Sequence, residues 1–350
     1  MKTLLTGGGT AGHVIPNIAL LPHLSAHELH YIGSHSGVER GLIEAEGIPY
    51  YAISSGKLRR YLSAENLKDA FRVTRGVSQA RRIIKRIKPN VVFSKGGFVA
   101  VPVVIAAKLS GIPVVIHESD ITMGLANKIC APFATKICCS FAEVMSDLSV
   151  KKAQHTGTPI REEIFAGSAK KGAQICAFPD NKPVLLAMGG SLGAQAINTC
   201  LQTALPQLIS KFNIIHITGK GHLYENLHSN HLRLFEYIGE NMADILAYAD
   251  IVVSRAGSNA INELLAIAKP NLLIPLSRAA SRGDQILNAQ SFEKLGYSRV
   301  LQEEELSPDR LKADIYKLFE EKERYISAMK KSPVKNGIAE IVRIIEGAAK

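Results

Sequence analysis

The sequence has few of the residues that mark several common protein classes. It contains no tryptophan, and aromatic residues make up only 6% of its 350 residues. Proteins that bind single-stranded nucleic acid stack the bases on aromatic side chains, and no motif of a nucleic-acid-binding fold is present. We therefore expect no nucleic-acid partner, although the formal net charge is +11.

Cysteine is scarce, and long hydrophobic runs are missing. Five cysteines without regular spacing exclude a disulfide-rich scaffold, and the adjacent Cys138 and Cys139 are expected in the core, on opposite faces of a strand. No run approaches the ~18 consecutive apolar residues of a membrane-spanning helix. The first six residues lead directly into glycines and are too short for a signal peptide. These features predict a cytoplasmic protein that is soluble or attached to a membrane surface.

Metal-binding patterns are absent from the sequence as well. There is no Asp-x-Asp sequence, and no group of histidine, cysteine, aspartate and glutamate residues has the spacing of metal ligands. We expect neither a metal ion nor a cofactor, so that side chains and backbone groups would supply the chemistry.

The sequence does contain a strongly basic segment. Residues 57–88 hold eleven lysines and arginines, opposed only by Glu65 and Asp69. Apolar side chains are interleaved with these cations, as in segments that rest on anionic lipid. They are Leu58, Tyr61, Leu62, Leu67, Phe71 and Val73. The segment predicts contact with an anionic membrane surface, and the alternative is the solvated face of a helix that connects two strands.

Short β-rich runs alternate with longer helical patterns along the whole chain. Continuous apolar runs such as residues 114–116 suit parallel strands that are buried on both faces. Strands are expected at residues 2–6, 29–32, 50–53, 91–94, 113–117, 137–140, 155–156, 184–188, 214–218, 233–236, 251–254 and 272–274. Helices are expected at residues 194–208, 259–268, 284–295, 308–331 and 337–345. The order predicts βαβ units and an α/β fold with two Rossmann-like, parallel-sheet domains, residues 1–158 and 159–334, that face each other across a cleft.

Glycine-rich turns follow three of these strands. Residues 7–12 fit the pattern G-x-G-x-x-G between a strand and a helix, and residues 95–98 and 189–194 repeat the arrangement. In this context backbone N–H groups and a helix N-terminus face an anion. A nicotinamide dinucleotide also needs an acid at the end of the next strand, but that strand ends Ile32-Gly33-Ser34. The turns predict sites for more than one phosphate group; the alternative for any single turn is a tight turn without a ligand.

Two polar loops of the second half suit a nucleotide sugar. Residues 254–259 precede a helix that carries Glu263, which can accept hydrogen bonds from both hydroxyls of a ribose. Its alternative role is that of a first-turn acid favoured by the helix dipole. Residues 281–285 form a polar turn of the kind that binds sugar hydroxyls, or an ordinary exposed helix start. Arg161 is a candidate cation for a diphosphate leaving group, or a plain surface arginine.

Seven motifs, in order, resemble those of the MurG family, the UDP-N-acetylglucosamine transferases that complete lipid II for bacterial peptidoglycan. They are residues 7–13 with Pro16, 96–98, 117–120, 157–161, 189–195, 254–263 and 282–288, and they cover nearly the whole chain. The resemblance implies a GT-B fold. In that fold the N-terminal domain holds the acceptor, the C-terminal domain holds UDP-N-acetylglucosamine, and the last helix, about residues 335–350, packs back on the first domain.

The resemblance also implies site residues. Positions that match contacts to UDP-N-acetylglucosamine are Thr10, Ala11, Gly12, Asp120, Arg161, Ser191, Ile238, Ser258, Asn259, Ala260, Glu263 and Gln285. Positions assigned to the diphosphate of the acceptor, the undecaprenyl-diphosphate-linked N-acetylmuramyl pentapeptide called lipid I, are Gly8, Gly9, Thr10, His13, Gly96 and Gly97. Many members have asparagine in place of Asp120. An ionised aspartate accepts a hydrogen bond from the sugar but donates none.

The implied chemistry is direct displacement at the anomeric carbon with inversion, in which a base removes the proton of the acceptor's C4 hydroxyl. His13 is the expected base, because the unperturbed pKa of histidine, about 6.5, suits proton transfer near neutral pH. The alternatives are that His13 only binds the acceptor diphosphate and that Asp120 is the base. Two related activities stay open, a UDP-sugar-dependent diacylglycerol glycosyltransferase and a UDP-N-acetylglucosamine epimerase.

Overall fold

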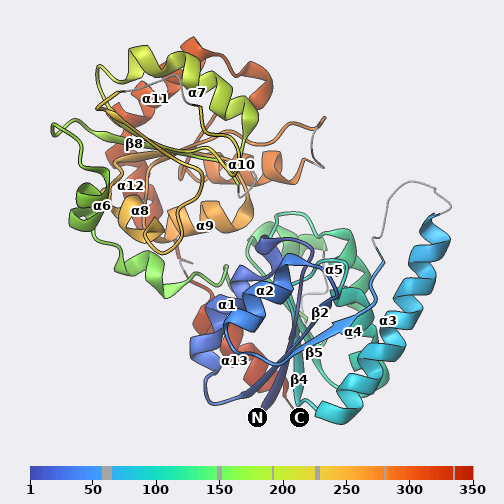
Figure 1. The fold of residues 1–350 in the computed structure, drawn as a ribbon. Helices are drawn as coiled ribbons and strands as arrows, with labels where there is room; N and C mark the ends of the chain where they lie inside the picture. Colours follow the sequence, from blue (N-terminus) through green and yellow to red (C-terminus); the bar gives the residue numbers. More distant parts are fainter. Residues whose placement is uncertain are drawn as a thin grey trace. The chain divides into compact units, whose positions relative to one another are not determined.

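The computed structural model describes residues 1–56, 65–147, 152–190, 193–224, 229–279, 281, 283–333 and 336–349. The chain forms two compact units (Figure 1). Unit 1 comprises Met1–Arg161 and Asn336–Lys350, and unit 2 comprises Glu162–Lys335. Within the described ranges, no helix is both long and apolar enough to cross a membrane.

Unit 1 is built on a seven-stranded sheet in the order β3-β2-β1-β4-β5-β6-β7, and every neighbouring pair is parallel. The strands are β1 Lys2–Thr6, β2 Glu28–Ser34, β3 Tyr50–Ile53, β4 Val91–Ser94, β5 Val114–Glu118, β6 Lys136–Cys139 and β7 Ala153–His155. All residues of β4 and β5 are buried, as expected for parallel strands with helices on both faces.

Helices cover both faces of this sheet. They are α1 Ile15–Leu20, α2 Val38–Ala45, α3 Glu65–Ile87, α4 Ala100–Leu109, α5 Leu125–Cys130 and α13 Ile338–Ala348, with short 3₁₀ turns η1 Ala11–His13, η2 Leu21–Leu24, η3 Ala131–Phe133 and η4 Ala142–Asp147. The C-terminal helix α13 lies beside α1 (Figure 1). Its Ile338, Ile341 and Ile345 recur at helical spacing and are buried in one core with Leu5 and Phe93 of the sheet. The last helix therefore completes the core of unit 1.

Unit 2 repeats the plan with a six-stranded parallel sheet in the order β10-β9-β8-β11-β12-β13. The strands are β8 Val184–Met188, β9 Asn213–Ile217, β10 Leu232–Phe235, β11 Ile251–Ser254, β12 Asn271–Leu273 and β13 Arg299–Val300. The helices are α6 Ala169–Cys176, α7 Gln195–Leu208, α8 Met242–Tyr248, α9 Ser258–Ala266, α10 Asp284–Lys294, α11 Pro308–Glu320 and α12 Lys322–Lys330, with 3₁₀ turns η5 Glu162–Ala166 and η6 Glu303–Glu305.

The two parallel sheets confirm the predicted α/β class. The bounds of several elements differ from the prediction, and two larger differences have a physical reason. The two-residue strand β13 was not expected, because so short a run carries no periodicity. The stretch 308–331, expected as one helical stretch, consists of two helices. The chain leaves the α region at Glu321, whose φ is −95° and ψ is 8°. Residues 57–64 of the basic segment lie outside the described residues.

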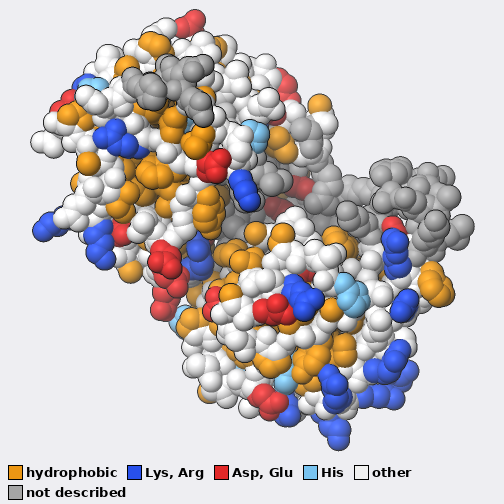
Figure 2. Space-filling view, viewed as in Figure 1, with side chains coloured by type: hydrophobic (Ala, Val, Ile, Leu, Met, Phe, Trp, Pro, Cys, Tyr) orange, Lys and Arg blue, Asp and Glu red, His pale blue; other side chains and the backbone are white. Residues whose placement is uncertain are grey.

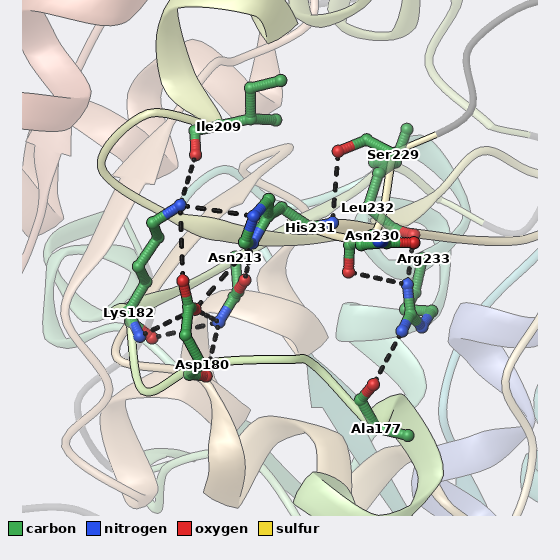
Figure 3. Close-up of polar contacts among 10 residues, drawn as sticks. All are labelled: Ala177, Asp180, Lys182, Ile209, Asn213, Ser229, Asn230, His231, Leu232 and Arg233. Atoms are coloured by element: carbon green, nitrogen blue, oxygen red, sulfur yellow. Dashed lines mark hydrogen bonds and ion pairs between the residues drawn. The ribbon is translucent and has the colours of Figure 1, made fainter.

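Side chains hold together the amino-terminal edge of the unit 2 sheet (Figure 3). Lys182 Nζ donates to the Ile209 carbonyl at 3.2 Å and lies 3.4 Å from both Asp180 and His231. Asn213 donates to Asp180 and to the Lys182 carbonyl. These bonds join the segment before β8 to the starts of β9 and β10, so the cluster ties the strands together at this edge.

Candidate active site

Three turns of unit 1 meet at the carboxyl ends of adjacent strands. Residues 7–13 follow β1, residues 95–97 follow β4 and residues 119–120 follow β5, and these strands are neighbours in the sheet. The strand order reverses between β1 and β4, which is where open α/β sheets bind ligands. A Cβ on Gly97, whose φ is +81°, would lie 2.1 Å from the Gly8 carbonyl oxygen. Glycine is therefore required for the first two turns to touch.

A buried carboxylate that no sequence motif indicated occupies one side of the first glycine turn. Glu39 of α2 is fully buried and accepts hydrogen bonds from Gly9 N at 3.2 Å, Ser34 N at 3.0 Å and Ser34 Oγ at 2.5 Å. A Cβ on Gly8 would lie 2.6 Å from this carboxylate. The Gly9 amide is thus engaged within the protein. An acceptor phosphate at this turn would have to use other groups, such as the exposed Thr10.

The turn continues into a 3₁₀ helix before α1 begins, rather than opening an α-helix directly. His13 ends this 3₁₀ helix, and its Nδ1 lies 3.0 Å from Thr10 Oγ1. With the proton on Nδ1, the ring donates to Thr10 and its basic nitrogen is Nε2. Thr10, Ala11, Gly12 and His13 are all exposed or half-buried, so a substrate can approach them.

The second turn and the loop after β5 are joined by the side chain of Lys95. Lys95 is 1% exposed, and its Nζ donates to Ser119 Oγ. Burial lowers the pKa of Lys95 to about 8, although the carboxylates of Glu118 and Asp120 act in the opposite direction. Burial also raises the pKa of Glu118, against the hydrogen bonds that it accepts. The sequence motifs include Lys95 only as part of the turn 95–98. The signal that could have selected it is a lysine directly after a short, mostly apolar strand.

The motif 117–120 divides into structural and exposed parts. His117 is fully buried, and its Nε2 donates to the Gly157 carbonyl at 3.0 Å. Burial holds its pKa well below the usual value, so it stays neutral and supports the structure. Glu118 accepts hydrogen bonds from the amides of Ser119, Asp120 and Gly124. The half-buried Asp120 is therefore held on a loop that its neighbour shapes.

Unit 2 carries a cavity of about 440 Å³ at the carboxyl edge of its sheet. The lining residues are Gly189, Gly190, Gly193, Ala194, Gln195, Ala196, Ser254, Arg255, Gly257, Ala260, Leu276, Gln285 and Glu303. They come from the turns after β8, β11, β12 and β13, around the point between β8 and β11 where the strand order reverses. Of the predicted donor residues, Ala260 and Gln285 line this cavity.

Three helices begin at this cavity. The residues that precede α7, α9 and α10 are Ala194, Gly257 and Gly283, none of which has a side chain that can cap a helix. The first turn of each helix contributes lining residues. Helix N-termini carry partial positive charge and N–H groups that bind anions. The three helix N-termini therefore make this cavity suited to bind a diphosphate.

An ion pair forms one wall of the same cavity. Arg255 pairs with Glu303, and it also donates to the carbonyl of Ile274 at 3.2 Å. Glu303 Oε2 accepts from Ser277 N at 2.9 Å. Gln285 accepts from Leu276 N at 3.0 Å, so its amide nitrogen is the group that remains to donate to a ligand. The pair was not predicted, because Arg255 and Glu303 lie on different loops far apart in the sequence.

The remaining predicted donor residues have the following positions. Ile238 lies after β10, and Ser258, Asn259 and Glu263 lie on α9; none of the four is among the described residues that line the cavity. Arg161 is the last residue of the first segment of unit 1. Ser191 lies outside the described residues. Among the described residues, no group of three or more His, Cys, Asp or Glu side chains could hold a metal ion.

The outer face of α3 is basic. Arg72, Arg75, Arg82 and Arg86 are exposed, and Figure 2 shows lysines and arginines gathered over this helix. Phe71 is 70% exposed. A second cavity, of about 700 Å³, opens between this helix and the carboxyl ends of β2 and β3. Its lining residues are Ser34, His35, Ser36, Ile53, Ser54, Ser55, Phe71, Arg72 and Arg75.

Comparison with known proteins assigns both units. Residues 3–139 match the glycosyltransferase family 28 N-terminal domain, and residues 184–343 match the C-terminal domain of the same family. Two curated relatives are each named UDP-N-acetylglucosamine–N-acetylmuramyl-(pentapeptide) pyrophosphoryl-undecaprenol N-acetylglucosamine transferase. The protein of Clostridium tetani (strain Massachusetts / E88) is 54% identical over 99% of this chain and 97% of its own length. The protein of Geobacillus thermodenitrificans (strain NG80-2) is 54% identical over all of this chain and 99% of its own.

Solved structures share the architecture. The crystal structure of Acinetobacter baumannii MurG has a TM-score of 0.78 at 26% identity and covers 99% of both chains. A UDP-GlcNAc 2-epimerase from Neisseria meningitidis has a TM-score of 0.69 at 13% identity and covers 99% of both chains, which shows a common fold alone. The family matches, the two parallel sheets and the full-length relatives lead to one assignment. This chain belongs to glycosyltransferase family 28, and it is a glycosyltransferase with the GT-B fold.

Proposed function

We propose that this chain transfers N-acetylglucosamine from UDP-N-acetylglucosamine to the C4 hydroxyl of the N-acetylmuramyl residue of lipid I, which yields lipid II for peptidoglycan synthesis. The observation that carries the proposal is the 54% identity, over essentially the full length, to transferases named for this reaction. The geometry of the two carboxyl edges supports it, since each offers groups suited to one of the two substrates.

The donor binds to unit 2. The three helix N-termini around the 440 Å³ cavity receive the diphosphate of UDP. The ribose hydroxyls donate to Glu263, and the uracil lies against Ile238. Ser191, Ser258, Asn259 and Ala260 contact the phosphates and ribose, and Gln285 donates to the sugar. Thr10, Ala11, Gly12, Asp120 and Arg161 of unit 1 complete the donor contacts.

The acceptor binds to unit 1. Gly8, Thr10, His13, Gly96 and Gly97 surround its diphosphate. The Gly9 backbone contributes shape rather than a hydrogen bond, because its amide donates to Glu39. The hydrogen bonds of Glu39 keep the turn rigid and occupy the Gly9 amide, so that the hydroxyl of Thr10 and the ring of His13 carry more of the binding.

The reaction is a single displacement. The acceptor C4 oxygen forms a bond to the anomeric carbon as the bond from that carbon to the diphosphate oxygen breaks, and the configuration inverts. The hydroxyl proton passes to Nε2 of His13, while Thr10 Oγ1 accepts a hydrogen bond from Nδ1–H, which stays on the ring, and so orients it. The electron pair of the broken bond leaves with UDP, whose added charge is stabilised by the helix N-termini. Asp120 is the second candidate for the base.

The site of action is the cytoplasmic face of the membrane, to which the protein attaches peripherally. The exposed arginines of α3 and the exposed Phe71 form a surface that suits anionic headgroups and the upper acyl region. Binding of the isolated protein to vesicles tests this. We expect sedimentation with vesicles rich in anionic lipid and release at high salt; equal binding to neutral vesicles would contradict the proposal.

A coupled assay tests the activity itself. Purified protein is mixed with UDP-N-acetylglucosamine and a short-chain lipid I analogue, with and without a chelator, and UDP release is followed together with the disaccharide product. We expect product in both conditions. Release of UDP only with diacylglycerol would replace lipid I by a glycolipid acceptor, and conversion of UDP-N-acetylglucosamine without any acceptor would indicate an epimerase.

A further inference from the structure

Lys95 is a buried cation for which the proposed chemistry has no role. It follows β4 at the strand-order reversal of unit 1, and its backbone N–H donates to the Thr6 carbonyl at 2.9 Å. Only 1% of its surface is exposed. Burial of an unpaired ammonium costs several kcal/mol in desolvation. We therefore expect the ammonium of Lys95 to have a partner.

The contacts of Lys95 lead across the sheet edge to the loop that carries Asp120. Its Nζ donates to Ser119 Oγ, and Ser119 directly precedes Asp120. A Cβ on Gly7 would lie 3.2 Å from the Lys95 Cβ, which places the stem of the lysine beneath the first glycine turn. One side chain therefore spans from the turn after β1 to the turn after β5.

The titratable groups around the ammonium differ in their protonation and in the other hydrogen bonds that they make. Its titratable neighbours are Glu118, Asp120, His117 and Cys138. His117 is neutral, and burial keeps the Cys138 thiol protonated by raising its pKa. Glu118 accepts hydrogen bonds from three backbone amides and from Asn127 Nδ2 at 3.0 Å. Asp120 is the half-buried carboxylate of this group that substrate can reach.

We infer that Lys95 is a positioning residue for the transfer reaction, whose ammonium holds the Ser119 hydroxyl and balances the charge of Asp120, so that Asp120 meets the sugar as a carboxylate in a fixed orientation. The inference rests on the proposed function and adds a residue to it. Lys95 touches neither substrate and acts through Ser119 and Asp120.

A double-mutant cycle tests the inference. Lys95→Met, Asp120→Asn and the double variant are compared with wild type in the coupled assay. The control is Lys182→Met, which removes a hydrogen-bonded lysine at the amino-terminal sheet edge of unit 2, away from the carboxyl edge of that sheet. We expect Lys95→Met to lower kcat by about 10-fold or more with little change in KM for the donor. We expect Asp120→Asn to cost about 10-fold less in the Lys95→Met background than in wild type.

Two further readouts distinguish positioning from a structural role. In the His13→Ala background, where His13 no longer sets the acidic limb of the pH profile of kcat, Lys95→Met should move that limb to higher pH, because an ionised carboxylate loses its counter-charge. In the otherwise wild-type protein, Lys95→Arg should restore part of kcat. Additive costs in the cycle, an unmoved acidic limb, or an equal loss in Lys182→Met would overturn the inference.

The same cycle measured as unfolding in denaturant needs no substrate. Coupling between Lys95→Met and Asp120→Asn supports the pairing, and additivity contradicts it. If Lys95→Met does not fold, the unfolding free energy of Asp120→Asn alone tests the pairing. This substitution should destabilise the protein at pH 7 and have no effect at pH 10, where Lys95 is neutral. A wild-type protein that gives no product from lipid I would refute the proposed function, and the pairing would still be decided by unfolding.

Discussion

The carboxyl edges of the two sheets are built from different kinds of groups. In unit 1, the buried side chains of Glu39, Lys95 and Glu118 shape the turns. In unit 2, the edge is formed by glycines and by three helices without capping side chains. Among the described lining residues there, the charged pair Arg255–Glu303 is hydrogen-bonded to the loop after β12, through the Ile274 carbonyl and the Ser277 amide. One edge is organised by ionisable side chains and the other by backbone dipoles.

This difference has a physical consequence for the two substrates. Backbone dipoles do not titrate and are already oriented by their helices, so they can hold a diphosphate across a wide range of pH. Ionisable side chains change charge with pH and respond to one another. Unit 1 should therefore determine the pH dependence of the reaction, whereas donor binding to unit 2 should vary little with pH.

The largest expected effect is at the base. Replacement of His13 by alanine should lower kcat by about 10²–10⁴-fold, because general-base assistance is lost, and should leave the affinity for UDP nearly unchanged. Steady-state kinetics and calorimetric UDP titration measure the two quantities. Asp120 would be the base instead if Asp120→Asn lost more kcat than His13→Ala and if His13→Ala stayed active at high pH.

Next in size is the contact between two turns of unit 1. Gly97→Ala should destabilise the protein by about 3 kcal/mol, since a left-handed residue gains strain and its Cβ meets the Gly8 carbonyl. Gly111→Ala is the matched control: its φ of +71° is similar, but no atom lies within 4 Å of the added Cβ, and about 1 kcal/mol is expected. Denaturant unfolding measures both. Equal losses would mean that the two turns do not constrain each other.

A smaller effect concerns the pH dependence of stability. The pKa of Lys95 is lowered from 10.5 to about 8, so between about pH 8 and pH 10.5 the unfolded chain binds a proton that the folded protein has released. Stability from this group therefore rises with pH in that window, by up to about 3 kcal/mol at its upper end. The difference in unfolding free energy between wild type and Lys95→Met should grow with pH. A flat difference would show that Lys95 titrates normally.

The smallest effect is expected at the ion pair of unit 2. Burial acts to raise the pKa of Glu303, but the hydrogen bonds from Ser277 and Arg255 outweigh it and the pKa is lowered. Glu303→Gln should cost about 1–2 kcal/mol of stability and raise KM for UDP-N-acetylglucosamine, because the loop with Leu276 and Gln285 loosens. The acceptor KM should not change. A change in the acceptor KM alone would contradict the separate roles of the two edges.

Part of the site follows from local sequence. The turns after β1, β4 and β8 were predicted because glycines follow short β-rich runs. Ala260 and Gln285, which the resemblance implied as donor contacts, line the cavity of unit 2, and their role stays a prediction. The strands β1, β3, β4, β8 and β11 begin and end at the predicted residues. The ends of the other predicted elements shifted by one to three residues. The helices α2, α4 and α6 and the two-residue strand β13 had no predicted range.

Other features depended on contacts between distant residues. Glu39 lies 30 residues from Gly9 and 5 from Ser34, and no local pattern distinguishes it from a surface acid at the start of a helix. Lys95 and Ser119 are joined only because β4 and β5 are neighbours in the sheet.

The sequence by itself determined which segments become strands, helices and glycine turns, because hydrophobic periodicity and backbone freedom are local properties. Only the tertiary structure decided which charges are buried against which turns, and which helix N-termini share one cavity. Burial and pairing depend on the strand order and on groups far apart in the chain, and these set the cost and the ionisation of each charge.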